Sequence, residues 1–217
     1  MYVLLCAATK FEIEATLKFL EQRPEIKSKL EVLITGVGLT AATYQLTKKI
    51  LTNKPRFVIQ AGICGSLDER LLPGEIVVVK DESIGDLGVM EKGVFTSLFN
   101  LGFLSMNEPP WIEGKLSNNE FILRKTGLQI VDGVTINEIS TNNDRILFYR
   151  NKLKASIETM EGAALHYVCL CEKIPFLQLR SVSNFAGERD KSKWAFHESI
   201  ASLNIELQRQ ISKYFTV

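Results

Sequence analysis

Short apolar runs alternate along this chain with longer segments in which apolar residues recur at helical spacing. The short runs are rich in aliphatic and β-branched side chains, and they predict strands over residues 2–8, 30–35, 56–61, 75–80, 128–135 and 176–182. Helical spacing predicts helices that end near residues 21 and 53, others at 163–172 and 193–214, and a helix or loop at 144–152. This alternation predicts an α/β fold with three layers, in which helices flank a mixed, mostly parallel central sheet.

The middle of the chain departs from this alternation. Residues 81–120 show little periodicity and contain Pro109-Pro110, so we expect a long excursion with one short helix at 96–102. No linker, internal repeat or low-complexity tract divides the sequence, and its 217 residues are within the size that one hydrophobic core can hold. We therefore expect a single domain over residues 1–217.

The rest of the chain is organised around residues 157–187, which predict a strand end, a helix and a second strand. Pro175 prevents the helix from continuing, and the residues that follow it are rich in strand formers. Glu161 precedes the helix, whereas Ser183 and Asn184 stand where the second strand ends. Because ligands bind at the carboxyl ends of strands in α/β sheets, we expect these polar groups to face one pocket from neighbouring strands.

Two glutamates are candidates for chemistry, and each also has an ordinary structural explanation. Glu12 follows the first strand, where it either reaches the edge of the sheet or forms a capping box with Thr9. Glu161 stands between an apolar strand and an apolar helix, so it is either a partly buried functional acid or a carboxylate favoured by the helix dipole. Arg180 lies inside an apolar strand and needs a carboxylate partner, so we expect a structural ion pair.

Two glycine-rich segments follow predicted strands. Gly36 and Gly38 superficially fit a dinucleotide-binding fingerprint, but no acid stands at the end of the next strand to bind a ribose, and a tight strand-to-helix turn is the better interpretation. Residues 62–66 predict a second turn, which either presents backbone amides to a ligand or merely reverses the chain. Trp194, in the polar loop after Asn184, is either a lid over the pocket or an ordinary cap before the last helix.

Composition narrows the classes of function. A net charge of +1 and the lack of a basic run argue against nucleic-acid binding, and no apolar stretch approaches the ~20 residues that span a membrane. The two histidines, His166 and His197, are expected to be packed or at the surface, and no metal site is predicted. The cysteines lie in apolar surroundings and are expected to be buried, reduced thiols of a cytoplasmic protein: Cys6, Cys64, Cys169 and Cys171.

Residues 160–164, with the sequence MEGAA, and residues 180–184, with the sequence RSVSN, resemble the purine nucleoside phosphorylase and nucleosidase family. The resemblance extends over nearly the whole chain and includes the first strand with Glu12, both glycine segments and residues 73–78. It implies that Glu12 activates an attacking water and that Met160 and Glu161 hold the ribose, Glu161 through its hydroxyls. It also implies that Asn184 contacts the purine at N7, that no metal or organic cofactor is required and that the protein is a homodimer.

Two departures from the family pattern indicate a subclass. Phosphorylases of this family carry an arginine and a serine where this chain has Gln60 and Ile63, so water is expected to attack in place of phosphate. Adenine-specific nucleosidases carry an aspartate where Asn184 stands, and an asparagine suits a 6-oxopurine better because it donates or accepts according to its orientation. Residues 85–88 and the loop around Trp194 are similar to the branch of the family that hydrolyses futalosine.

The resemblance therefore implies hydrolysis of the 6-oxopurine nucleoside futalosine to hypoxanthine and dehypoxanthine futalosine in menaquinone biosynthesis. A methylthioadenosine or adenosylhomocysteine nucleosidase is one alternative, although Asn184 counts against it. A non-catalytic nucleoside-binding protein is another, although binding alone does not need a water-activating acid such as Glu12. We expect six further residues to line the substrate pocket: Gly62, Ile63, Phe95, Ile146, Leu147 and Trp194.

Overall fold

The computed structural model describes residues 2–216, which contain one eight-stranded sheet in the order β10-β4-β8-β9-β3-β1-β2, with β7 paired to β4. Three pairings, β10–β4, β3–β9 and β4–β7, are antiparallel, and the other pairings are parallel, so the predicted mixed, mostly parallel sheet is confirmed. The strands are β1 (Val3–Ala7), β2 (Leu30–Ile34), β3 (Phe57–Ser66), β4 (Ile76–Ile84), β7 (Leu116–Ser117), β8 (Gln129–Thr135), β9 (Ile157–Thr159) and β10 (Phe176–Phe185).

The centre of this sheet closes on itself. The second half of β3 pairs with β10 on one side and with β9 on the other. From β9 the pairing continues to β8, then to β4, and from β4 back to β10. Five strands therefore form a closed circuit, and β1 and β2 extend from β3 as an open wing. The closure gathers the ends of β3, β9 and β10 around one point.

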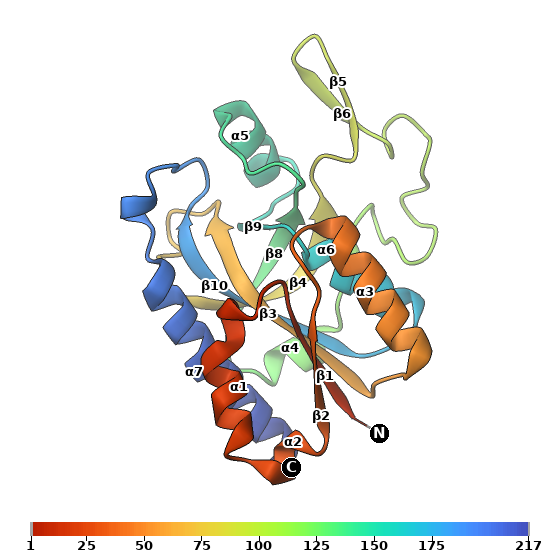
Figure 1. Cartoon of the computed structure of the whole chain (residues 1–217). Helices are drawn as coiled ribbons and strands as arrows, with labels where there is room; N and C mark the ends of the chain where they lie inside the picture. The colour runs from red at the N-terminus through yellow and green to blue at the C-terminus, as the bar shows by residue number, and fades with distance from the viewer. Residues whose placement is uncertain (1, 217) are drawn as a thin grey trace.

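Helices cover both faces of the open wing and make the predicted three layers (Figure 1). One layer holds η1 (Phe11–Ile13), α1 (Glu14–Glu21), α2 (Pro24–Lys27), α4 (Glu120–Arg124) and α7 (Phe196–Thr216), and the other holds α3 (Leu39–Thr52) and α6 (Gly162–Cys171). Figure 1 shows α5 (Asn143–Asn151) near the ends of β9 and β10, apart from both layers. The short helix η2 (Lys191–Lys193) precedes α7.

The continuous apolar run of β1 is explained by these two layers. Val3 and Leu5 belong to the core that includes α1 and α7, whereas Leu4 and Cys6 belong to the core that includes α3 and α6. Successive side chains of a strand point to opposite faces, so a strand covered on both faces needs apolar residues at every position. All five residues of β1 are buried accordingly.

The prediction of a turn at residues 62–66 is wrong, because these residues are the second half of β3. A Cβ at Gly62 would clash with the side chain of Arg180, and a Cβ at Gly65 would crowd the side chain of Glu158. The glycines therefore keep the strand extended where large polar side chains cross it. β10 likewise continues through Ser183 and Asn184, with a register shift between Val182 and Asn184.

The predicted helix at residues 96–102 is also wrong. Residues 94–97 form strand β6 (Val94–Ser97), which pairs with β5 (Gly88–Glu91) in a hairpin that stands clear of the main sheet (Figure 1). Lys92 and Gly93, the two residues between the strands, both have positive φ, which is the geometry of a tight two-residue hairpin turn. The local pairing of Met90 with Phe95 thus prevails over the weak helical pattern.

Three of the four cysteines are buried as predicted, but Cys171 at the end of α6 is exposed. His166 is buried against Phe176 and contacts the backbone oxygen of Leu116 through Nδ1, whereas His197 is exposed. Within residues 2–216, none of the helices has the length and apolarity that a membrane span requires.

Candidate active site

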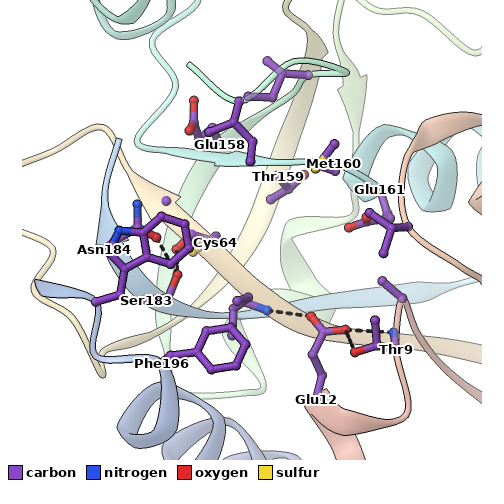
Figure 2. A pocket seen from close by; sticks show the side chains of 17 residues that line it. Thr9, Glu12, Cys64, Glu158, Thr159, Met160, Glu161, Ser183, Asn184 and Phe196 are labelled. Atoms are coloured by element: carbon purple, nitrogen blue, oxygen red, sulfur yellow. Dashed lines mark hydrogen bonds between the residues drawn. The ribbon is translucent and has the colours of Figure 1, made fainter. Parts of the chain in front are cut away.

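A cavity of about 250 Å³ lies where β3, β9 and β10 end, beside the loop that follows β1. Figure 2 shows Glu12 and Glu161 along one side of this cavity and Asn184 with Ser183 on the opposite side. The lining contains three glutamates, and among the described residues it contains no lysine or arginine. Ala8, Val37, Ile63, Ile136, Ile139 and Phe196 supply apolar wall.

Glu12 is buried and fixed through both carboxylate oxygens. Oε1 accepts a hydrogen bond from the backbone N–H of Ile63 at 3.2 Å. Oε2 accepts from the backbone N–H and from the hydroxyl of Thr9, each at 2.9 Å. Thr9 does not cap a backbone N–H of η1 or α1 with its side chain, so its hydroxyl serves the carboxylate instead. Only half of the considered capping box forms, because Glu12 accepts from the Thr9 N–H, and the same contact orients Glu12 at the cavity.

Glu161 is held from two other parts of the chain. Its Oε1 accepts a hydrogen bond from Gly38 N–H at 2.9 Å, and its Oε2 lies 3.7 Å from Nη1 of Arg180, which is the predicted ion pair. Burial raises the pKa of Glu161, while the Arg180 cation and the Gly38 amide act in the opposite direction. Gly38 has a φ of +93°, so the glycine turn after β2 presents its amide to this carboxylate.

Gly62 brings the two acids into one neighbourhood. A Cβ at Gly62 would collide with Nη1 of Arg180 and would lie 3.0 Å from Oε1 of Glu12. Arg180 pairs with Glu161 and also donates to Oε1 of Gln60 at 2.7 Å. Glu12 also contributes to the raised pKa of Glu161 through like-charge repulsion. Glu12, Arg180 and Glu161 thus form one charged cluster at the edge of the cavity.

Asn184 is oriented by its neighbours on the other side. Its Oδ1 accepts from the hydroxyl of Ser183 at 2.7 Å, and its Nδ2 donates to the backbone oxygen of Phe185 at 2.9 Å. Ser183 Oγ also lies 3.1 Å from the backbone oxygen of Cys64. An amide group carries two N–H donors, so one donor of Asn184 is available to a ligand in the cavity.

The other predicted site residues divide into two groups. Met160, Ile63 and Trp194 line the cavity, and Gly62 lies directly behind Glu12. Phe95, Ile146 and Leu147 do not line it. Phe95 lies beneath the guanidinium of Arg145 in a neighbouring cavity, and Leu147 is 48% exposed. Ile146 packs beside Ala186 and Gly187. Of the two α5 residues, Ile146 packs into a separate core with Tyr149 and Leu147 is exposed, while Phe95 belongs to the β5–β6 hairpin.

Sequence reasoning did not single out Glu158 and Phe196. Glu158 lies in β9, lines the cavity and is 5% exposed, and burial raises its pKa to about 7. The sequence feature that could have identified Glu158 is its position as a lone acid between Ile157 and Thr159 in a strand that is buried throughout. Phe196 opens α7 and stacks on Phe11 with a ring-centroid distance of 5.7 Å, which carries the η1 turn and Glu12 against the start of the last helix.

Comparisons with known proteins agree with this arrangement. The sequence profile of the phosphorylase superfamily matches residues 14–215. Futalosine hydrolase of Thermus thermophilus is 30% identical over 192 residues, which cover 83% of this chain and 80% of that protein. The 5'-methylthioadenosine/S-adenosylhomocysteine nucleosidase of Buchnera aphidicola is 25% identical over 186 residues, which cover 82% and 75% of the two chains.

A solved structure agrees on the fold. A mutant of the Helicobacter pylori nucleosidase named MTAN, crystallised with 5'-methylthioadenosine in its active site, aligns with a TM-score of 0.80 over 98% of each chain at 18% identity. With the profile match over residues 14–215, the protein belongs to the phosphorylase superfamily. The predicted family and enzyme class, an N-glycosyl hydrolase, are confirmed by these relatives.

Proposed function

We propose that the protein hydrolyses the N-glycosidic bond of the 6-oxopurine nucleoside futalosine and releases hypoxanthine. The observation that carries this proposal is the meeting of Glu12, Glu161 and Asn184 around one cavity of about 250 Å³. The 30% identity to a futalosine hydrolase supports the choice of nucleoside. A role in menaquinone biosynthesis, a homodimer and a cytoplasmic location stay predictions that accompany this proposal.

Glu12 and Glu161 act on the ribose side of the N-glycosidic bond, and Asn184 acts on the purine side. As the bond to C1' breaks, its electron pair moves to the purine, and positive charge develops on the ribose. Glu161, bound to the ribose hydroxyls, stabilises that positive charge electrostatically. Asn184 donates its available N–H to N7 and stabilises the negative charge on the leaving base. Glu12 accepts a proton from water as the water oxygen bonds to C1', and the departing purine takes up one proton from solvent.

The charges around the cavity favour water over phosphate as the attacking group. A phosphate nucleophile needs cationic or amide donors, but the described lining has three carboxylates and no lysine or arginine. Arg180 contacts a lining residue, but its guanidinium is already engaged with Glu161 and Gln60. The amide of Gln60 in turn lies 3.4 Å from the backbone oxygen of Glu161. An anion would therefore enter a region of negative potential.

A methylthioadenosine or adenosylhomocysteine nucleosidase is the second candidate, because several curated relatives carry that name. The two candidates use the same acids and differ at the base. An aspartate can accept from the 6-amino group or shuttle a proton to N7, whereas Asn184 brings a neutral amide. The hydrogen-bonded orientation of this amide, with Nδ2 toward Phe185 O, suits N7, which is an acceptor in both purines, so the neutral side chain is what favours the 6-oxopurine.

The release of free purine is the direct test. The enzyme would be incubated with futalosine, inosine or methylthioadenosine, with and without inorganic phosphate, and the free base quantified by chromatography. We expect the highest kcat/KM with futalosine and no dependence on phosphate. Rates that increase with phosphate would contradict the hydrolase, and a preference for methylthioadenosine would establish the second candidate.

A further inference from the structure

Three residues in register across neighbouring strands form one wall of the cavity. Asn184 of β10 is paired with Gly65 of β3, and Gly65 is paired with Glu158 of β9. Residues that pair across strands project from the same face of a sheet, and strands are about 4.8 Å apart. Asn184 and Glu158 therefore flank Gly65 with a Cα separation of roughly 10 Å, and all three residues line the cavity.

Gly65 keeps the space between the two polar side chains open. A Cβ at this position would lie 3.1 Å from Cγ and 3.3 Å from Oε1 of Glu158. Gly65 does not have a left-handed φ, so the glycine is needed for space and not for its backbone conformation. Gly65 thus leaves an open surface on this wall of the cavity, with the amide of Asn184 on one side and the carboxyl group of Glu158 on the other.

Glu158 is buried with one of its carboxyl oxygens unpaired, although the hydroxyl and the backbone N–H of Ser140 lie close enough to lower its pKa. It is 5% exposed, and its Oε2 makes no hydrogen bond to any residue between 2 and 216. Ser140, in the loop after β8, is its polar neighbour and partly offsets the effect of burial on its pKa, yet Ser140 Oγ also lacks a partner of normal geometry. A buried carboxyl oxygen without a partner costs free energy, so its placement at a cavity points to a ligand.

We propose that Glu158 hydrogen-bonds the edge of the purine that carries the 6-substituent. Asn184 contacts the opposite, imidazole edge, and the base lies over Gly65. This inference rests on the proposed nucleosidase function and assigns the group that distinguishes the two classes of purine. Glu161 and Glu12 stand on the other side of the cavity, where the ribose and the water would lie (Figure 2). Glu158 thus determines specificity and does not take part in bond cleavage.

The hydrogen-bonding pattern of the bases explains the discrimination. A 6-oxopurine carries a hydrogen on N1, and an ionised carboxylate accepts it. A 6-aminopurine has a bare acceptor at N1, which an ionised carboxylate repels and only a protonated carboxyl group can satisfy. A site built around one donor–acceptor pattern rejects the other strongly, because a buried polar group is left unpaired.

The protonation state of Glu158 therefore sets the preference. Its pKa is raised to about 7 by burial, with Ser140 acting in the opposite direction. The titratable groups close enough to sense its charge are Cys64 of β3 and Tyr149 of α5, and burial keeps the pKa of both above their usual values. Both neighbours are therefore neutral near pH 7, and Glu158 is the group among these three that changes charge there.

The first test compares two nucleosides that differ only at the 6-position, futalosine and its 6-amino counterpart. In the unsubstituted enzyme, the ratio of kcat/KM for the 6-oxo over the 6-amino substrate should increase about tenfold per pH unit, or about 100-fold between pH 6 and pH 8, because the two substrates need opposite protonation states of one group, Glu158. In Glu158→Gln the ratio should be small and independent of pH, since a neutral amide pairs with either base. Glu138→Gln, which changes an exposed glutamate of the adjacent loop, should retain the full pH dependence.

The second test does not depend on turnover or on a variant. Binding of free adenine and free hypoxanthine would be measured calorimetrically at pH 8 in two buffers with different ionisation enthalpies. Adenine should bind with uptake of about one proton, which goes to Glu158, and hypoxanthine should bind without uptake. A ratio that is flat with pH, an unchanged slope in Glu158→Gln or equal proton uptake for both bases would overturn the assignment. Loss of base release from both nucleosides would instead refute the proposed function, and calorimetry would still decide the role of Glu158.

Discussion

At the scale of single residues, the candidate site depends on carboxylates whose oxygens are already directed by donors. Glu12 has three donors from Thr9 and Ile63, and Glu161 has the amide of Gly38 and the guanidinium of Arg180. Donors that are fixed before substrate arrives do not have to reorganise during reaction, which is the main source of electrostatic catalysis. The chemical roles of Glu12 and Glu161 can therefore be tested by substitutions that keep their shape.

Glu12→Gln and Glu161→Gln should each lower kcat by at least about 100-fold, because the first removes the base for water and the second removes the charge opposite the ribose cation. Both variants should stay folded, since glutamine preserves the volume. The measurement is purine release together with circular dichroism. Glu14→Gln, an exposed glutamate of α1, is the matched control and should leave kcat unchanged. Unchanged turnover in Glu12→Gln or Glu161→Gln would remove that residue from the mechanism.

Asn184→Asp should shift the preference from 6-oxopurine toward 6-aminopurine nucleosides. An aspartate replaces the N–H that favours N7 of hypoxanthine with a group that can carry a proton to N7 of adenine. The readout is the ratio of kcat/KM for inosine over adenosine, which we expect to fall about tenfold, the change that ~1.4 kcal/mol of differential binding produces. An equal loss on both nucleosides would contradict the specificity argument.

At the scale of elements, the sequence predicted the strand ends that carry the site but not how the sheet closes. The strand–helix–strand unit around Glu161 was predictable because Pro175 and the apolar runs are local signals. The pairing of β9 with both β3 and β8 was not, because a strand of three residues has no periodicity of its own. Local sequence also predicts a turn at the glycines of β3, because only the tertiary contacts with Arg180 and Glu158 explain them.

The glycine turn between β2 and α3 offers a matched pair of substitutions. Gly38 and Gly93 have φ values of +93° and +81°, and a Cβ at either position would meet nothing within 4 Å. Gly93→Ala should cost ~1–2 kcal/mol of unfolding free energy, and Gly38→Ala should cost ~1–3 kcal/mol, because Gly38 also has a ψ of 160° and that combination is readily adopted only by glycine. Only Gly38→Ala should also reduce kcat, because it displaces the amide that holds Glu161. Chemical denaturation and purine release would measure the two effects, and equal activity in both variants would contradict the role of the Gly38 amide.

At the scale of the whole molecule, the closed circuit of strands buries acids, and this burial raises their pKa values toward neutral pH. Glu82 and Glu158 both have pKa values raised to about 7 by burial, whereas burial lowers the pKa of His166 to about 4. Glu82 accepts hydrogen bonds from Gln178 and Thr135 inside the circuit. A Cβ at Gly162, at the start of α6, would collide with Glu82. The same packing that brings Glu161 to the cavity therefore places acids where ionisation is costly.

These shifts predict how stability depends on pH. An acid whose pKa is raised on folding binds its proton more tightly in the native state, so its contribution is full below the unfolded value and is lost as pH rises toward 7 and beyond. The pKa of each acid is raised from 4.5 to about 7, which sets an upper limit of about 3 kcal/mol for each. His166, whose pKa is lowered, acts in the opposite direction and destabilises the fold as pH falls from 6.5 toward 4.

We therefore expect the free energy of unfolding to be greatest near pH 4–5, because above pH 4.5 the two acids lose more stability than His166 regains, and to fall by a few kcal/mol by pH 8, as measured by urea denaturation across this range. Glu158→Gln should stabilise the protein at pH 8 but not at pH 5, because it removes a buried carboxylate that is charged only at the higher pH. Glu138→Gln, at an exposed position, should reproduce the original pH profile. If Glu158→Gln and the unsubstituted protein lost stability in parallel between pH 5 and pH 8, Glu158 would have to be ionised throughout, and a partner for its charge would have to exist in the folded state.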